Sequence, residues 1–310
     1  MAGRRRLLFA FTPVPSALHA NVDGAAGPIA LHGGMPIARR LPIFVLALFG
    51  AAQPALAADA YSSDWADGLK SSARLIAGAP ADGVLQAGVE IKLAPGAITY
   101  WRNPGDAGLP PTLSFEGSSN LAQARTSFPA PRRLREGSGE AFGYDGGLIL
   151  PIDIEPIEPA KPVALALKLN YAVCERICVP AEASLRLVLP VEAAAPSPYA
   201  GAIANAKNLT PRRVEWPIPA ADLTATSGRT WRLCLAAQAG PKRDLFIEPP
   251  DAWWIDVRPD ASGPAGTDCF RLNLMEQPPD SALPVAARLT ITGGRGPIET
   301  TIALKAGAEP

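Results

Sequence analysis

The sequence predicts an all-β protein built from two β-sandwich domains. Prolines and glycines are frequent, 34 and 28 of 310 residues, and the apolar segments are short and bounded by turn residues. Several segments alternate between apolar and polar side chains, as in Val-Glu-Ile-Lys-Leu at residues 89–93. This is the period of a strand with one buried face. Many short strands at such spacing are typical of sandwiches.

The first domain is expected over residues 58–192. Short apolar segments bounded by turn residues give its candidate strands. These strands are residues 88–93, 112–115, 148–154, 163–169 and 184–189. An alanine- and proline-rich segment at 193–198 then interrupts the pattern and is typical of a linker.

The second domain is expected over residues 193–310 and is smaller. Ser197 and Pro198 favour a helix that continues to about Lys207, with proline at its first position. Strand-like segments follow. They are residues 230–236, 244–247, 254–257, 269–274 and 287–292. Two adjacent glycines then predict a closing hairpin between residues 288–292 and 297–304.

Residues 1–57 are interpreted as an upstream extension followed by a secretory signal peptide. Met35 begins a short basic segment, an apolar run follows over residues 41–52, and Ala-Leu-Ala at 55–57 matches the small-x-small cleavage pattern. The apolar run is shorter than the roughly 20 residues that a spanning helix needs, and an uncleaved anchor is the alternative. We therefore expect export to the periplasm, an oxidising compartment where disulfides persist.

Cleavage after Ala57 would change both the charge and the composition of the chain. It would leave 253 residues with 24 basic and 28 acidic side chains, a net charge of about −4, which argues against nucleic acid as a partner. Both histidines, His19 and His32, precede Met35, so the mature chain would contain none. Catalysis by Ser-His-Asp or Cys-His groups and histidine-based zinc sites are thereby excluded.

Two of the four cysteines lie close together in Tyr-Ala-Val-Cys-Glu-Arg-Ile-Cys-Val-Pro, residues 171–180. A disulfide needs Cα atoms roughly 4.4–6.8 Å apart, whereas residues i and i+4 of a straight strand are about 13 Å apart. Cys174 and Cys178 can therefore bond only if the three residues between them turn the chain back. Closing so small a loop stabilises a fold less than closing a long one, which favours a redox-active pair.

Two aromatic segments accompany the cysteines. Tyr100 and Trp101 lead into Arg-Asn-Pro-Gly-Asp-Ala-Gly-Leu-Pro-Pro, which also fits an ordinary strand end and turn. Phe142 and Tyr144 stand among glycines at residues 140–147. Aromatic side chains in such a segment either cover a reactive group or anchor a core.

Together these segments resemble the amino-terminal periplasmic domain of the thiol:disulfide interchange protein DsbD and its relatives in ScsB-type proteins. The resemblance covers residues 72–191. It is carried, in order, by Tyr-Trp-Arg-Asn-Pro-Gly-Asp-Ala-Gly-Leu-Pro-Pro, Phe-Gly-Tyr, Leu-Ile-Leu-Pro-Ile and Cys-Glu-Arg-Ile-Cys-Val-Pro. It implies an immunoglobulin-like β-sandwich. The best-known members space their cysteines more widely than Cys-x3-Cys, and the ScsB-like branch is more similar to this chain.

The resemblance implies that Cys174 and Cys178 form a redox pair that relays electrons, with no cofactor beyond the disulfide. A membrane-embedded thiol reductase would reduce the pair, and the pair would reduce periplasmic thioredoxin-fold proteins. The membrane-spanning and thioredoxin-like domains of the full-length family members have no counterpart in this sequence. The electron donor is therefore expected to be a separate polypeptide.

The resemblance also implies the surroundings of the pair. Phe142 and Tyr144 fall where the family has a loop that caps the cysteines. The other residues expected around the site are Tyr100, Trp101, Asp106 and Tyr171.

The other two cysteines, Cys234 and Cys269, lie 35 residues apart in strand-like segments of the second domain. Their spacing suits a link between strands of one sandwich. In an oxidising compartment this predicts a structural disulfide, with a second redox pair as the alternative.

Two other functions remain open. Two thiolates can hold Cu(I), because soft ligands select that ion, although after cleavage Met275 would be the one methionine left and no histidine would remain. A noncatalytic β-sandwich interaction module with two structural disulfides also fits, since a fold by itself implies no activity. Metal stoichiometry on the reduced protein and the resistance of Cys174–Cys178 to mild reduction separate these hypotheses.

Overall fold

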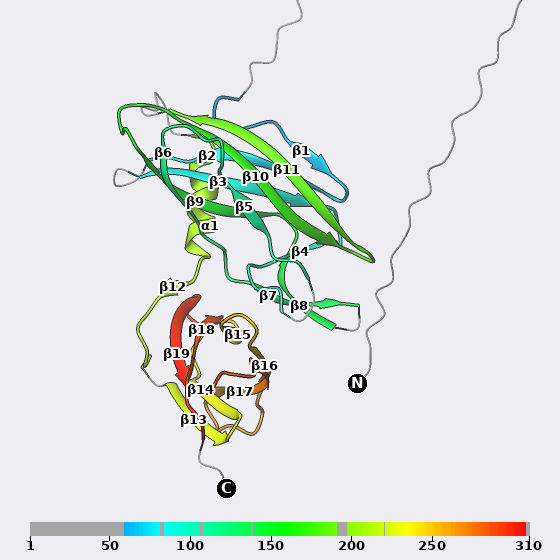
Figure 1. Cartoon of the computed structure of the whole chain (residues 1–310), viewed down its shortest axis with the longest axis vertical. Helices are drawn as coiled ribbons and strands as arrows, with labels where there is room; N and C mark the ends of the chain where they lie inside the picture. Colours follow the sequence, from blue (N-terminus) through cyan, green and yellow to red (C-terminus); the bar gives the residue numbers. More distant parts are fainter. Residues whose placement is uncertain are drawn as a thin grey trace, which may run out of the picture. The chain divides into compact units, whose positions relative to one another are not determined.

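Strands dominate the computed structural model, as the alternating sequence pattern predicts (Figure 1). The structure describes residues 59–80, 84–105, 108–137, 139–190, 197–219 and 221–307. The predicted extension and signal peptide lie outside these residues. So do Asp106 and the boundary expected between residues 192 and 193, which stays a prediction.

The first sandwich is formed by the strands that precede the helix. They are β1 Ala66–Gly68, β2 Ser71–Ala77, β3 Leu85–Leu93, β4 Ile98–Tyr100, β5 Thr112–Ser114, β6 Leu121–Thr126, β7 Arg132–Glu136, β8 Gly139–Asp145, β9 Leu148–Pro156, β10 Val163–Cys174 and β11 Cys178–Leu189. One sheet has the order β1-β2-β3-β9-β6 and the other β11-β10-β4-β8-β7, with β5 also paired to β10. Alternate side chains of both sheets, such as Leu75, Ile152 and Leu167, form the apolar core.

Several strands were not predicted from the sequence, and each has a physical reason. β7 carries mostly charged side chains, half of the residues of β6 are polar or charged, and both strands lie at the ends of their sheets. They therefore bury little apolar surface. β8 contains the glycines that suggested a loop. Here Gly143 is required, because a Cβ at this position would lie 2.1 Å from the Thr99 carbonyl oxygen of β4. The two strands can pair only because this side chain is absent.

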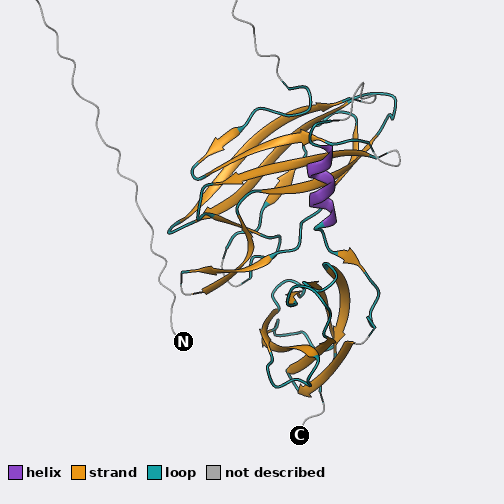
Figure 2. Ribbon diagram, turned by 180° about the vertical axis from the view of Figure 1, so that it is seen from behind, coloured by secondary structure: helices purple, strands orange, loops and turns teal. Residues whose placement is uncertain are grey.

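The helix, α1, spans Ala200–Asn208 and packs against β9 and β3 (Figure 2). The predicted start at Ser197 is two residues early. Tyr199 is the N-cap and makes no capping hydrogen bond through its side chain. The Ser197 hydroxyl instead donates to the Ala77 carbonyl oxygen and accepts from the Tyr199 amide. It therefore ties the start of the helix to β2.

The second sandwich follows α1 and has its own apolar core. Its strands are β12 Arg212–Arg213, β13 Ala221–Ser227, β14 Thr230–Ala236, β15 Asp244–Glu248, β16 Trp254–Pro259, β17 Thr267–Glu276, β18 Val285–Thr292 and β19 Ile298–Leu304. Its sheets have the orders β12-β19-β18-β15 and β13-β14-β17-β16. The predicted closing hairpin is confirmed as the antiparallel pair β18–β19. The fold class, an immunoglobulin-like sandwich followed by a smaller one, is confirmed.

Candidate redox site

The two cysteines of the 171–180 segment end the longest hairpin of the first sandwich. β10 and β11 pair in register over their full lengths, and Cys174 and Cys178 are the last opposed residues before the turn. Glu175, Arg176 and Ile177 form that turn. The Cα atoms are 4.0 Å apart, and a disulfide joins the two side chains. The hairpin thus supplies the reversal of the chain that the sequence spacing demands.

The disulfide lies on the outer face of its sheet. Side chains alternate along β10, so Tyr171 and Val173 enter the core between the sheets while Ala172 and Cys174 point the other way. Cys174 is 2% exposed, whereas Cys178 and the turn residues are exposed, with Ile177 at 77%. One sulfur atom is therefore protected by the protein and its partner faces solvent.

Tyr100 covers the buried sulfur. Its hydroxyl oxygen lies 2.7 Å from Cys174 Sγ and 3.3 Å from Cys178 Sγ, and it donates to Glu136 Oε1 at 2.7 Å. Burial of the phenol, together with the Glu136 carboxylate, raises the pKa of Tyr100 well above its usual value. Tyr100 is thus a neutral hydrogen-bond donor at any physiological pH.

Glu136 is the second polar group at the sulfurs. Its Oε1 lies 2.8 Å from Cys178 Sγ, which places it to accept a hydrogen bond from the Cys178 thiol once the disulfide is reduced. Its Oε2 is buried and has no hydrogen-bond partner among the described residues. Glu136, Cys174 and Cys178 offer three ligand atoms within 4.8 Å of one another, the combination through which this site could hold a metal ion.

Backbone pairing brings these groups together from three separate segments. β4 pairs with β10 next to the cysteine, opposing Ile98 to Cys174, and the Thr99 hydroxyl donates to the Ala172 carbonyl oxygen at 2.8 Å. β8 pairs with β4 on one side and with β7 on the other, which carries Glu136 into position. Gly108 packs on the Tyr100 ring, where a Cβ would lie 2.4 Å from Cε1.

The predicted cap of Phe142 and Tyr144 requires a correction. Ala141 shares the cluster of Tyr100 and Cys174, and its neighbours along β8 alternate in direction, so Phe142 and Tyr144 point to the opposite face. The Tyr144 hydroxyl donates to the Pro129 carbonyl oxygen at 2.8 Å. Both aromatic residues join a separate cluster, and Tyr100 is the aromatic residue in contact with the sulfurs.

The other residues expected around the site also differ in whether they contact the disulfide. Trp101 is fully buried in the cluster of Phe142 and Tyr144, away from the cysteines. Tyr171 lies in the core between the sheets, where its hydroxyl is 2.8 Å from Ser71 Oγ. Asp106 lies outside the described residues. Of the four, Tyr100 therefore reaches the disulfide and Trp101 and Tyr171 do not.

The sequence interpretation missed Glu136 and Gly108. Glu136 ends an Arg-Leu-Arg-Glu strand and has no spacing relation to the cysteines, so no signal in one sequence identifies it. Gly108 belongs to the recognised Asp-Ala-Gly-Leu segment. The presence of glycine there was visible, but its contact with the Tyr100 ring was not.

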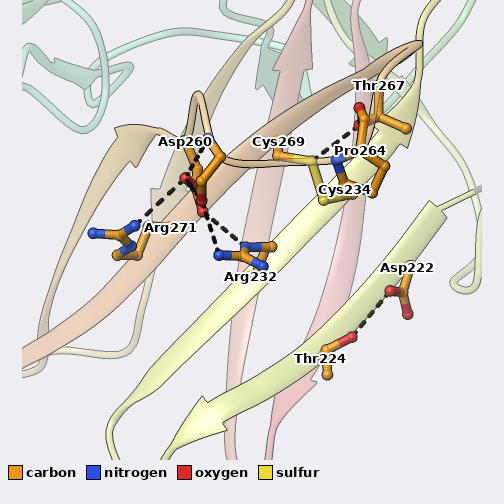
Figure 3. Close-up of a disulfide and its surroundings, with 10 residues drawn as sticks. Asp222, Thr224, Arg232, Cys234, Asp260, Pro264, Thr267, Cys269 and Arg271 are labelled. Carbon is orange, nitrogen blue, oxygen red and sulfur yellow. Dashed lines mark hydrogen bonds and ion pairs between the residues drawn. A yellow bond between two sulfur atoms is a disulfide. The ribbon is translucent and has the colours of Figure 1, made fainter.

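The second disulfide joins Cys234 of β14 and Cys269 of β17, which are directly opposed in neighbouring strands of one sheet. Figure 3 shows the pair beside Thr267, whose hydroxyl lies 3.2 Å from Cys269 Sγ. A Cβ at Gly263 would lie 2.2 Å from Cys269 Sγ, so this loop covers that sulfur closely. Both cysteines are buried. The structural role expected for this bond stays a prediction.

The loop that covers the second disulfide is held by Asp260. Arg232 and Arg271 both approach its carboxylate in Figure 3, with Arg232 Nε donating at 2.8 Å and Arg271 at 3.4 Å. The Ser262 hydroxyl and amide also donate to it. These hydrogen bonds, those of Ser262 first, hold the pKa of Asp260 well below its usual value. The carboxylate therefore stays charged and keeps the loop closed over Cys269.

A β-sandwich with a half-exposed disulfide at a hairpin tip has the arrangement of a thiol–disulfide exchange domain. Residues 70–190 match the family model described as "Thiol:disulfide interchange protein DsbD, N-terminal". The match covers 121 of the 310 residues, so the first sandwich is similar to the DsbD N-terminal family. The matched segment contains Cys174 and Cys178.

A solved structure supports the fold. The N-terminal periplasmic domain of ScsB from Proteus mirabilis matches with a TM-score of 0.61 at 18% identity, covering 80% of this chain and 99% of that chain. CfaE, the adhesive subunit of the CFA/I fimbria of enterotoxigenic Escherichia coli, reaches a TM-score of 0.14 at 10% identity over 82% of this chain and 89% of its own, which carries no argument. Comparison with curated protein sequences gives no match.

In the described part of the chain, no helix combines the length and the apolar character needed to cross a bilayer.

Proposed function

We propose that this protein is a periplasmic thiol–disulfide oxidoreductase module that relays electrons through Cys174 and Cys178. The observation that carries the proposal is the asymmetry of the disulfide. Cys178 is exposed at the tip of the hairpin, while Cys174 is buried beneath the Tyr100 hydroxyl. An exchange site needs one sulfur that a partner can attack and a second that stays protected.

Reduction of the site begins at the exposed sulfur. A thiolate of the donor attacks Cys178 Sγ, a mixed disulfide forms, and the Cys174–Cys178 bond breaks with its electron pair on Cys174. The Tyr100 hydroxyl lies 2.7 Å from both Glu136 Oε1 and Cys174 Sγ. Its one proton can therefore turn from Glu136 to the new Cys174 thiolate and stabilise the negative charge on that sulfur. The donor's second thiol then attacks the mixed disulfide, leaving an oxidised donor and a dithiol site.

Delivery of electrons is the same chemistry in reverse. The Cys178 thiol loses its proton to the medium or to Glu136 Oε1, which lies 2.8 Å away. The Cys178 thiolate attacks the partner's disulfide, and Cys174 then attacks Cys178 Sγ and releases the partner as a dithiol. Two electrons and two protons pass to the partner, and the Cys174–Cys178 bond forms again.

The partners in this scheme are a membrane-embedded thiol reductase as donor and a periplasmic thioredoxin-fold protein as acceptor. The match of residues 70–190 to the DsbD N-terminal family model supports thiol-redox partners in general. The ScsB domain is periplasmic, and we extend this location to the present chain. No cofactor other than the disulfide enters the mechanism.

Trapping of the mixed disulfide tests the proposal. A thioredoxin-fold protein whose resolving cysteine is replaced by serine is mixed with the full chain, and the adduct is mapped by mass spectrometry. We expect an adduct on Cys178, none with Cys178→Ser, and an accumulated adduct when Cys174→Ser is challenged with an oxidised partner. An adduct on Cys174, or none in any variant, would contradict the assignment of the attacked sulfur.

The reduction potential supplies an independent readout. A relay site should equilibrate with thioredoxin-type dithiols, at roughly −200 to −270 mV. Titration against a thiol–disulfide buffer, followed by thiol mapping, measures the potential for each cysteine pair. A value for Cys174–Cys178 below about −300 mV, the range of structural bonds, would instead favour the noncatalytic interaction module.

A further inference from the structure

We infer that the reduced site binds a zinc ion through Cys174, Cys178 and Glu136. The three ligand atoms come from β10, β11 and β7, and all lie within 4.8 Å of one another. Zinc prefers four ligands in a tetrahedron and accepts thiolate sulfur and carboxylate oxygen together. The set of two sulfurs and one carboxylate oxygen suits this ion better than Ca²⁺ or Mg²⁺, which take oxygen ligands.

Glu136 supplies the independent sign of a cation site. Its Oε2 is buried and has no hydrogen-bond partner in the described part of the chain. None of the ion pairs formed by the described residues includes Glu136. Burying an oxygen of a charged carboxylate with no cation beside it costs free energy. A zinc ion beside the sulfurs would supply the missing positive charge.

The oxidation state of the cysteines controls this site. In the disulfide form the two sulfurs are bonded to each other and neither is a thiolate. Ligands of a tetrahedral zinc ion with Zn–S distances of about 2.3 Å lie roughly 3.8 Å apart. Reduction must therefore break the bond and let the sulfurs separate before the ion can enter. The opposed positions of Cys174 and Cys178 at the end of the hairpin allow both to reach one ion.

The remaining groups complete the site without adding a protein ligand. Cys178 faces solvent, so a water molecule can occupy the fourth position. Tyr100 stays protonated and lies 2.7 Å from both Cys174 Sγ and Glu136 Oε1. It therefore donates a hydrogen bond to a ligand, the role that outer partners have at metal sites.

A zinc ion bound at this position would prevent thiol–disulfide exchange at the site. Both sulfurs would be engaged as ligands, so Cys178 could not attack a partner until the ion left. Binding releases the protons of both thiols, and the affinity for zinc is expected to rise with pH. The inference requires only that the disulfide can be reduced, and it is independent of the identity of the redox partners.

Zinc titration of the reduced full chain tests the inference. The protein is reduced with a phosphine, the reductant is removed, free thiols are counted, and Zn²⁺ is added in competition with a chromophoric chelator. We expect one ion per chain in the reduced protein and none in the oxidised protein. Glu136→Gln should weaken binding by at least about tenfold, the lower end of what loss of even an outer partner costs.

Matched variants make the test specific. Glu175→Gln removes a carboxylate next to Cys174 that pairs with Lys70 instead of the sulfurs, and it should bind zinc as the wild type does. Tyr100→Phe should retain the ion, because the phenol is not a ligand. The double variant Cys174→Ser/Cys178→Ser should bind none, which also tests whether Cys234 and Cys269 hold the ion.

Several results would overturn the inference. They are zinc binding by the oxidised protein, zinc binding by the double serine variant, or equal affinity in Glu136→Gln. A site that takes Cu(I) through the two sulfurs, unaffected by Glu136→Gln and without affinity for Zn²⁺, would also overturn it. If zinc fails to bind while the mixed disulfide still forms on Cys178, the metal site is wrong and the exchange function stands.

Discussion

Tyr100 is the side chain that can respond when negative charge appears on Cys174. Its hydroxyl contacts the sulfur at 2.7 Å and stays protonated. Tyr100→Phe removes this donor, and hydrogen bonds to charged groups contribute about 1.5–3 kcal/mol. Because a hydrogen bond from Tyr100 stabilises the Cys174 thiolate, we expect its loss to slow alkylation of Cys174 at neutral pH by about tenfold or more. The alkylation rate of the reduced protein measures this effect.

The control for that variant is Tyr144→Phe. Tyr144 is also a buried tyrosine with a hydrogen-bonded hydroxyl, but it donates to the Pro129 carbonyl oxygen in the separate aromatic cluster. Tyr144→Phe should alter stability without altering the alkylation rate of Cys174. Equal alkylation profiles for Tyr100→Phe and the wild type would show that the phenol does not stabilise the thiolate.

Buried tyrosine side chains also lower the stability of the fold at alkaline pH. Burial raises the pKa of Tyr100, Tyr144 and Tyr171, with Glu136 adding to the effect at Tyr100. A raised pKa in the folded state contributes stability that is complete below the unfolded phenol value of about 10 and is lost above it. These three of the five tyrosines should therefore ionise together with unfolding. Tyrosinate absorbance and circular dichroism, followed together, test this; ionisation of all five in a folded protein would contradict it.

At the level of elements, the loop after β4 holds the Tyr100 ring over the disulfide. Gly108 has φ +112°, and a Cβ there would lie 2.4 Å from the ring. Gly108→Ala should lower the free energy of unfolding by about 1–3 kcal/mol and speed attack on Cys174 by displacing the ring. Denaturant unfolding and alkylation kinetics measure the two effects.

Gly146 offers the matched control for that loop. It also has positive φ, +89°, but a Cβ there would meet no atom within 4 Å. Gly146→Ala should lower the free energy of unfolding only through the strain of placing alanine at positive φ. It should leave the reactivity of Cys174 unchanged. If both variants behave alike, the contact of Gly108 with the ring has no role in shielding the sulfur.

The strands that sequence alone predicted are those with a buried alternating face. β3, β9 and the strands of the closing hairpin have this pattern, and the structure confirms them. β7 carries three arginines and a glutamate in five residues, and no apolar period marks it as a strand. Its position depends on pairing with β8, a tertiary contact that propensity does not describe.

Part of the candidate site could likewise be predicted from the sequence, and part could not. The spacing of Cys174 and Cys178 requires the chain to turn between them if they bond, because a straight strand would hold their Cα atoms about 13 Å apart. The hairpin meets this requirement. Glu136 reaches the sulfurs through the pairing of β7, β8 and β4, across 38 residues of sequence from Cys174. Phe142 was expected to cap the cysteines because the family that the chain resembles has a capping loop at this position. Here the segment is a strand, which fixes the side chains that share a face.

At the scale of the molecule, described residues of both sandwiches belong to one structural unit. The segment that follows Tyr100 contacts the second sandwich directly. Arg102 donates to both oxygens of Glu248 at 2.7 and 2.9 Å, and Asn103 Nδ2 donates to the Ile247 carbonyl oxygen at 2.8 Å. A bidentate arginine–carboxylate pair fixes orientation as well as distance. The second sandwich therefore helps to hold the segment that carries Tyr100.

Phe246 is the apolar centre of this contact and provides the test of it. The ring is 1% exposed and packs edge-on against Trp101 and Phe142, with centroids 6.0 and 4.9 Å apart. Phe246→Ala should lower the free energy of unfolding by about 3–5 kcal/mol. It should also divide a single calorimetric unfolding transition into two. The rate at which the Cys174–Cys178 disulfide is reduced should change as well. Phe270→Ala, a buried phenylalanine within the second core, should lower the transition temperature without changing that rate. Two transitions in the wild type, or equal reduction rates in both variants, would show that the sandwiches act independently.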